Sequence, residues 1–180
     1  MTLSGRYRRS SLGFLQTLIL IGLVFSLPPA GAQSSALTGE VTWVYDGDTL
    51  ELAGIGKVRL IGIDVPERKP SVRDRFLVDQ GIEPARLREI HAQAIAFVIK
   101  TAKGKMVDLS LDRDTRDRHG RFLAYVVLPD GRNLNRLLLE KGLAVVYRRF
   151  DFDLKDDFLS AEAEARRRGH GLWAKSKGPS

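Results

Sequence analysis

Hydrophobic and polar residues alternate along the chain from Thr38 onward, a pattern that is typical of a β-strand. The alternating apolar residues are expected to share one face of this strand: Val41, Trp43 and Tyr45. The pattern stops at Asp46-Gly47, a strong hairpin signal between two strand-like runs. A second strand is expected over residues 48–52 and a third, rich in β-branched and aliphatic residues, over residues 57–63. The sequence therefore predicts a meander of three strands.

The next segment mixes turn-forming residues, a helical pattern and two further strand-like runs. Residues 64–83 contain prolines, a glycine and many charges without a sustained period, so an irregular, exposed loop is expected. A helix is expected to begin at Pro84, since apolar residues recur at helical spacing from there to Gly104. Strands are expected around residues 106–111 and 122–128, with a polar stretch between them.

Two helices are predicted near the C-terminus. Asn133 or Asn135 caps a short helix that ends near Gly142. An amphipathic helix then runs from about Leu154 to Arg168 and is stopped by Gly169. We assign Trp43 and Trp173 to packing, His91 and His170 to helix surfaces, and Arg148-Arg149 and Arg166-Arg167-Arg168 to solvated charges, of which the first pair could also follow a nucleic-acid backbone.

Five strands and three helices in this order predict an α+β protein dominated by a β-barrel. Five short strands must hide their edges, and a helix separates the third strand from the fourth. This arrangement favours a five-stranded, partly open barrel of the oligonucleotide-binding (OB-fold) type.

The first 32 residues differ in character from the rest. Three arginines precede an apolar run over residues 14–27, and Ala30-Gly31-Ala32 fits a cleavage site. We expect a signal peptide over residues 1–32, cleaved after Ala32, and an exported domain over residues 33–180, with its core at about residues 38–174, in the periplasm or outside the cell. The alternatives are an uncleaved membrane anchor and, from the arginine pair at residues 8–9, a twin-arginine export signal.

Composition limits the chemistry. The 180 residues contain no cysteine, which excludes thiolate chemistry and disulfides, and only three histidines. The formal net charge is +7, of which +4 remains once the three arginines of residues 1–32 are removed. A basic balance suits a polyanionic partner.

Carboxylates stand beside two of the expected strand ends. Asp48 follows the hairpin dipeptide and Asp64 follows the third strand, so a meander that curls into a barrel brings them together. Paired carboxylates suit Ca²⁺ or Mg²⁺, whereas the lack of cysteine and the few histidines make zinc improbable. Glu67 lies three residues beyond Asp64, after Pro66, within reach of a water molecule at such a metal.

Two arginines complete this set of residues. Arg59 lies in the third expected strand and Arg121 lies at the end of the segment Asp117-Arg118-His119-Gly120-Arg121. A guanidinium fork binds phosphate through two hydrogen bonds and stays charged at any accessible pH. Together with the carboxylates, these arginines predict phosphoryl chemistry in which Glu67 takes a proton from the attacking water.

The segments DGDT, RLIGIDVPE and DRHGRFLAY, in this order and at these spacings, resemble the staphylococcal nuclease (thermonuclease) family over nearly the whole mature chain. The resemblance implies cleavage of DNA or RNA by a calcium-dependent endonuclease with little sequence specificity, leaving 3′-phosphates. It also implies functional roles at six positions: calcium ligation by Asp48, Asp64 and the backbone carbonyl of Val65, phosphate binding by Arg59 and Arg121, and catalysis by Glu67. The closing Gly171-Leu172-Trp173 resembles the packing tryptophan of the family.

Three departures from the family pattern affect the substrate more than the reaction. Val65 replaces a threonine of the best-known member, which matters little if the backbone carbonyl is the ligand. His119 stands where the family often has a tyrosine that contacts a nucleotide phosphate, and with Arg118 and Tyr147 it is expected to bind substrate. The loop after Glu67 is longer by about a dozen residues.

A non-catalytic OB-fold module that binds oligonucleotides is the alternative. It would have no use for Glu67 or for paired carboxylates, which repel phosphate when no cation is present. The enzyme is therefore favoured. We expect a monomer, with nucleic acid as substrate and no stable protein partner.

Overall fold

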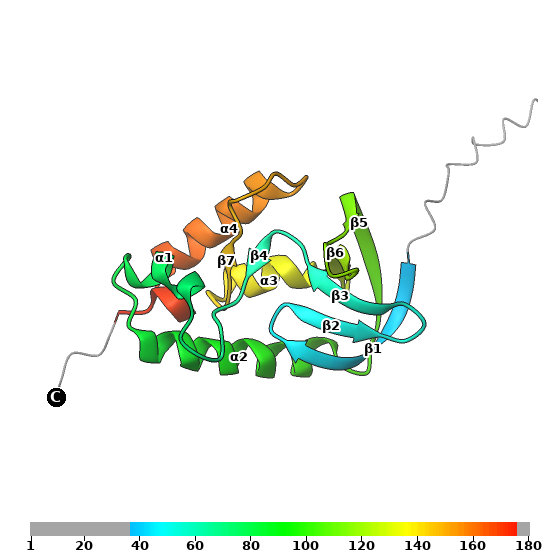
Figure 1. Cartoon of the computed structure of the whole chain (residues 1–180), viewed down its shortest axis with the longest axis horizontal. Helices are drawn as coiled ribbons and strands as arrows, with labels where there is room; N and C mark the ends of the chain where they lie inside the picture. Colours follow the sequence, from blue (N-terminus) through cyan, green and yellow to red (C-terminus); the bar gives the residue numbers. More distant parts are fainter. Residues whose placement is uncertain (1–36, 176–180) are drawn as a thin grey trace, which may run out of the picture. The chain divides into compact units, whose positions relative to one another are not determined.

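The computed structural model describes residues 37–175. The predicted signal peptide and its cleavage after Ala32 lie outside the described residues. The strands are β1 (Leu37–Asp46), β2 (Thr49–Leu52), β3 (Gly56–Leu60), β4 (Ile63–Asp64), β5 (Met106–Arg116), β6 (Phe122–Val127) and β7 (Val145–Val146) (Figure 1). The α-helices are α1 (Arg75–Val78), α2 (Pro84–Ala102), α3 (Leu134–Glu140) and α4 (Lys155–Arg168), and the 3₁₀ turns are η1 (Val72–Asp74) and η2 (Gly171–Trp173). Within residues 37–175 no helix has the length and apolarity needed to cross a bilayer.

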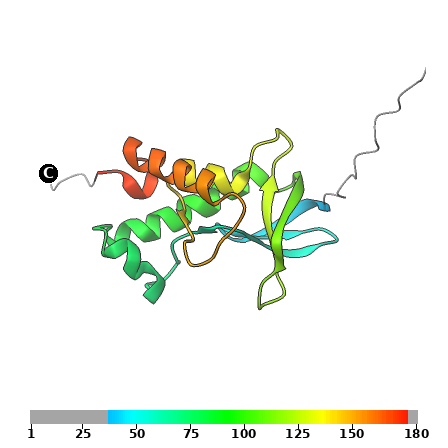
Figure 2. The same cartoon turned by 90° about the horizontal axis from the view of Figure 1, so that it is seen from above.

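Five strands form a closed barrel in the order β1-β2-β3-β6-β5, which confirms the predicted five-stranded barrel. The barrel is closed rather than partly open, because β1 pairs with β5 over Leu37–Glu40. All neighbouring strands are antiparallel except β3 and β6, which are parallel. In Figures 1 and 2 the barrel strands lie at one end of this domain and α1 and α4 at the other. Helix α2, predicted from its spacing, runs from the helical end to contact β1.

The first strand departs from its predicted alternation. A β-bulge between Val41 and Trp43 shifts the pairing with β2, so Val41 and Val44 are buried while Trp43 is 55% and Tyr45 47% exposed. The prediction that Val41 shares a face with Trp43 and Tyr45 is therefore wrong, and so is the assignment of Trp43 to packing. Trp173 does pack against the hydrophobic core.

The third predicted strand is divided. β3 ends at Leu60, and the chain turns at Gly62, whose φ of +79° suits glycine. A side chain at this position would also collide with the Phe152 ring, 2.6 Å from the site of a Cβ. Beyond the turn, β4 leaves the barrel and pairs with β7, Ile63 opposite Val146. This turn carries Asp64 away from the barrel sheet.

The segment over residues 64–83 is not the irregular, exposed loop that its composition predicts. It contains η1 and α1, and Leu77 and Ile82 pack in the core at 5% and 8% exposure. Asp74 is also buried and forms an ion pair with Arg88 of α2 at 2.6 Å. The segment is therefore anchored on α2. With α1 included, the described chain has four α-helices where three were expected.

Helix α3 shows which of two asparagines is the cap. The side chain of Asn133 accepts a hydrogen bond from the backbone N–H of Arg136, so Asn133 is the N-cap. Asn135 is instead fully buried, and its amide binds backbone groups of Ile61, Ala124 and Val126. The last predicted helix is confirmed, since α4 ends at Gly169 in the left-handed conformation.

Candidate functional site

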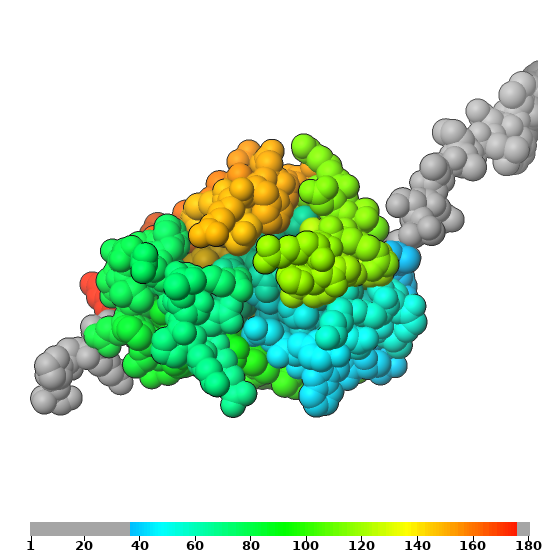
Figure 3. All heavy atoms as spheres, in the orientation of Figure 1, coloured from blue at the N-terminus to red at the C-terminus, as the bar shows by residue number. Residues whose placement is uncertain are grey.

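A cavity of about 870 Å³ opens where the barrel meets the helical part of the domain. It lies between the green loop residues before α2, the gold segment after β7 and the yellow-green turn between β5 and β6 (Figure 3). All nine residues that the sequence predicts for the site line it: Asp48, Arg59, Asp64, Val65, Glu67, Arg118, His119, Arg121 and Tyr147. Folding thus gathers residues from distant segments of the chain around one space.

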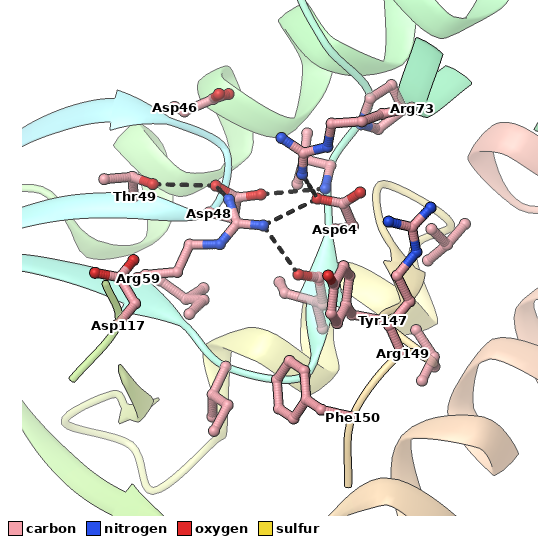
Figure 4. Close-up of a pocket in the computed structure, with 18 of the residues that line it drawn as sticks. Asp46, Asp48, Thr49, Arg59, Asp64, Arg73, Asp117, Tyr147, Arg149 and Phe150 are labelled. Carbon is pink, nitrogen blue, oxygen red and sulfur yellow. Dashed lines mark hydrogen bonds and ion pairs between the residues drawn. The ribbon is translucent and has the colours of Figure 1, made fainter. Parts of the chain in front are cut away.

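Arg59 joins the two predicted metal ligands. Its guanidinium forms ion pairs with Asp48 and with Asp64, the latter at 2.9 Å between Nη2 and Oδ1, and donates to the Ile63 carbonyl at 3.3 Å (Figure 4). Burial would lower the pKa of Arg59, but the two carboxylates outweigh it and raise the pKa above its ordinary value. Arg59 therefore stays charged in this partly buried position.

Asp48 is held by both neighbouring segments. It is 1% exposed, and its Oδ2 accepts a hydrogen bond from the Val65 backbone N–H at 3.2 Å. Its Oδ1 accepts one from the Thr49 hydroxyl at 3.1 Å. The Asp48 carbonyl accepts from the Leu60 N–H at 2.8 Å, which ties the hairpin turn to the end of β3. These contacts bring Asp48 and Val65 together.

Asp46 is a further carboxylate at the cavity, one that the sequence prediction missed as a site residue. Burial and the nearby Asp48 raise its pKa. Burial also raises the pKa of Asp64, although Arg59 and Arg73 act in the opposite direction. The carboxylates thus stand close enough to repel one another, a condition that a cation relieves.

The donor set fits a hard cation. Within residues 37–175 no three Asp, Glu or His side chains are gathered into a ready-made metal site. Asp48 and Asp64 nonetheless both form ion pairs with the guanidinium of Arg59. The ligand atoms that these two side chains and the Val65 carbonyl can offer are oxygens. Carboxylate and carbonyl oxygens suit Ca²⁺ or Mg²⁺. These residues therefore fit such an ion, provided that Arg59 and Arg73 release their contacts with the two carboxylates.

Glu67 is paired with an arginine that the sequence did not single out. Its Oε1 accepts a hydrogen bond from Nη1 of Arg73 at 2.5 Å, and Arg73 also forms an ion pair with Asp64 (Figure 4). Arg73 lies in η1, within the segment whose composition suggested an exposed loop. No sequence signal separated it from neighbouring charges, because its position depends on the anchoring of that segment.

Arg121 is oriented by Asp117. Its Nε donates to the Asp117 carboxylate at 2.7 Å, and its Nη1 reaches the Thr49 hydroxyl at 3.4 Å. Asp117 also accepts from the backbone N–H groups of His119 and Arg121, at 2.8 and 3.0 Å. Burial would raise the pKa of Asp117, but these hydrogen bonds outweigh it and the pKa is lowered. Asp117 therefore positions the phosphate-binding candidate, while Arg118 and His119 are exposed at the rim.

The segment after β7 closes another side of the cavity with aromatic and basic groups. The rings of Tyr147 and Phe150 make a tilted contact with centroids 5.1 Å apart, and Arg149 is exposed (Figure 4). Arg148 is exposed, as predicted, and it also forms an ion pair with Glu162, which is 1% exposed. Both arginines line the cavity.

His91 corrects another prediction. It is 9% exposed rather than a surface residue of α2, and its Nδ1 lies 2.9 Å from the Pro66 carbonyl oxygen. A carbonyl can only accept, so Nδ1 carries the proton. Nδ1 also lies 3.6 Å from Asp46. His91 therefore holds the backbone immediately before Glu67 against α2. His170 is exposed, as expected.

Comparison with known proteins gives matches over most of the chain. The profile of staphylococcal nuclease homologues matches residues 57–175. An uncharacterised endonuclease of Escherichia coli is 32% identical over 158 residues, which span 86% of this chain and 87% of that protein. The uncharacterised protein MJ1439 of Methanocaldococcus jannaschii is 36% identical over 147 residues, 75% of this chain and 70% of that protein.

Endonuclease YncB of Bacillus subtilis is 33% identical over 137 residues, which cover 73% of this chain and 59% of that protein. The profile match covers more than half of the chain. It includes five of the six positions to which the resemblance assigns a role, and only Asp48 precedes it. The chain belongs to the staphylococcal nuclease homologue family and is a nuclease-type hydrolase of that family.

Proposed function

We propose that this protein is an exported, calcium-dependent endonuclease that hydrolyses phosphodiester bonds of DNA, RNA or both and leaves 3′-phosphates. The observation that carries the proposal is the convergence of Asp48, Asp64, Glu67, Arg59 and Arg121 on one cavity. The relatives named as endonucleases support the same reaction class.

The two arginines bind the phosphodiester. Arg59 and Arg121 both reach the hairpin segment, Arg59 through Asp48 and Arg121 through Thr49, so a phosphate above this segment lies within reach of both. Guanidinium groups fixed beforehand cost no reorganisation when charge develops on the phosphate oxygens. Asp117 keeps Arg121 in place during this step, since it contacts Nε and Nη2 of the guanidinium, whereas Nη1 is directed toward Thr49.

Asp48, Asp64 and the backbone carbonyl of Val65 would hold the calcium ion. When bound, the ion supplies positive charge against the phosphate as its negative charge grows. Burial raises the pKa of Asp64 and Arg59 acts against it, which favours the ionised carboxylate that a hard cation requires.

Glu67 acts as the general base. Its carboxylate takes a proton from a water molecule whose oxygen bonds to phosphorus, the bond from phosphorus to the 5′-oxygen breaks, and that oxygen takes a proton from solvent. Oε1 of Glu67 accepts a hydrogen bond from Arg73, so the proton goes to Oε2 or to Oε1 after this contact is released. The products are a 3′-phosphate and a 5′-hydroxyl.

The rim of the cavity suits a nucleic-acid strand. Tyr147 and Phe150 offer ring faces for base stacking, and Arg149 and Arg118 offer charges for flanking phosphates. None of these groups presents a base-specific pattern of donors and acceptors, which favours binding with little sequence preference.

The deciding experiment measures release of acid-soluble nucleotides from DNA and from RNA by the purified protein. We expect release with Ca²⁺, less with Mg²⁺ and none with excess chelator. Binding of an oligonucleotide without any release in Ca²⁺ would instead identify a non-catalytic binding module. Export is tested separately by N-terminal sequencing of the protein recovered outside the cytoplasm, which should begin at Gln33.

A further inference from the structure

Arg73 spans two carboxylates to which we assign different tasks. One arm of its guanidinium contacts Asp64, a proposed cation ligand, and the other contacts Glu67, the proposed base. The same Oδ1 of Asp64 also receives Arg59. Two guanidinium groups therefore pair with the acidic side chains of this part of the cavity.

The position of Arg73 is built into the fold. Ser71 and Asp74 form reciprocal side-chain to backbone hydrogen bonds around η1, one of them from the Ser71 N–H to Asp74 at 3.0 Å. Asp74 in turn pairs with Arg88 of α2, and Leu77 packs in the core. Arg73 therefore lies in a turn that is fixed to the rest of the fold, and this turn holds its side chain near the two carboxylates.

Arg73 is more exposed than the two acids that it contacts. Its side chain is 46% exposed, against 31% for Glu67 and 20% for Asp64. A divalent cation at Asp64 would repel a guanidinium bound to the same carboxylate oxygen. The cation and Arg73 therefore compete for the Asp64 carboxylate, and binding of either one weakens binding of the other.

We propose that Arg73 sets the cation affinity of the site by competing with the divalent ion for Asp64, and that ion binding releases both Asp64 and Glu67 from it. The inference rests on the proposed function for the identity of the ion. The lengthened segment after Glu67 would then have a function, because it carries Arg73, the arginine that competes with the ion.

Calorimetric titration of the metal-free protein with Ca²⁺ alone tests this. The variant Arg73→Gln should bind Ca²⁺ at least about fivefold more tightly than the control Arg75→Gln. Arg75 is exposed two residues along the same segment and does not line the cavity, so both variants change the net charge equally. Arg73→Lys keeps the charge but loses the fork that reaches both acids, and should give an intermediate affinity. Circular dichroism verifies the fold of each variant.

The outcomes separate this inference from the proposed function. Tighter binding by Arg73→Gln alone supports the competition, as does binding by that variant when the wild type binds no Ca²⁺. Equal affinity in Arg73→Gln and Arg75→Gln, or weaker binding by Arg73→Gln, overturns it and leaves a calcium-dependent nuclease standing. Absence of Ca²⁺ binding in every protein, the Arg73 variants included, overturns both the competition and the proposed calcium dependence.

Discussion

Asn135 donates a hydrogen bond to the Ile61 carbonyl at 2.9 Å across 74 residues of sequence. Its amide also donates to the Ala124 carbonyl at 3.2 Å and accepts from the Val126 N–H at 3.1 Å. One fully buried side chain therefore joins α3 to β6 and to the segment that leads into the site. Such a group stabilises only while every polar partner is satisfied.

Replacing Asn135 by leucine should therefore be costly. Asn135→Leu leaves three buried backbone groups without this partner and should lower the free energy of unfolding by about 2–4 kcal/mol. Asn133→Ala, which removes only the α3 cap, should cost about 1 kcal/mol. Urea unfolding measures both, and an Asn135→Leu variant as stable as Asn133→Ala would refute the linking role.

The variant Glu67→Gln should lose turnover but keep the fold. An amide cannot accept the proton of the attacking water, so the rate of DNA digestion in Ca²⁺ should fall by about 10²–10⁴-fold. Glu89→Gln is the control, since Glu89 is exposed on α2 and does not line the cavity. Activity of Glu67→Gln equal to that of the control would show that another group is the base.

Arg121→Lys should also lose most of its activity. Lysine cannot both bind Asp117 through Nε and direct a second nitrogen toward Thr49, so the phosphate loses a preorganised donor. We expect a fall in kcat of about 10²-fold. The matched control is Arg132→Lys, because Arg132 also pairs with an aspartate, Asp130, but lies outside the cavity. Similar kcat values for the two variants would exclude Arg121 from phosphate binding.

Asp112 predicts how stability responds to acid. Burial would raise its pKa, but hydrogen bonds from the Tyr125 hydroxyl at 2.5 Å and from the N–H groups of Asp153 and Arg113 lower it below the ordinary 3.8. The pKa is lower in the folded state, so this stabilisation is present above pH 3.8 and is lost as the pH falls through the folded value.

The variant Asp112→Asn should accordingly be less stable than wild type at neutral pH and should show a shallower loss of stability in acid. Urea unfolding at several pH values compares it with Asp79→Asn, a change at an exposed residue of the anchored segment. A slope against pH identical in wild type and Asp112→Asn would contradict the lowered pKa.

Gly47 should tolerate no side chain. Its backbone lies outside the left-handed region, so Gly47→Ala adds no backbone strain, but a Cβ would lie 2.8 Å from that of Ala94 and 2.9 Å from a methyl group of Val65. We expect a loss of about 1–3 kcal/mol from overpacking. Thermal unfolding measures it, and addition of Ala94→Gly should recover part of the loss if the clash is the cause.

Local patterns predict much of this protein. The alternation, turn dipeptides and helical spacing predict five barrel strands and the helices α2, α3 and α4, because each of these depends on residues near one another in the chain. Three short motifs at fixed spacings carry eight of the nine predicted site residues, all except Tyr147, and all nine line one cavity.

The tertiary structure alone decided the features that depend on distant contacts. Trp43 is exposed because a bulge shifts β1 against β2, and His91 is buried because the Pro66 carbonyl lies against α2. Arg73 reaches Asp64 because α2 anchors a segment whose composition suggests a loop. Sequence by itself determined which chemical groups this nuclease carries and in what order; which carboxylate meets which arginine was decided by packing, because those contacts join residues that no local pattern relates.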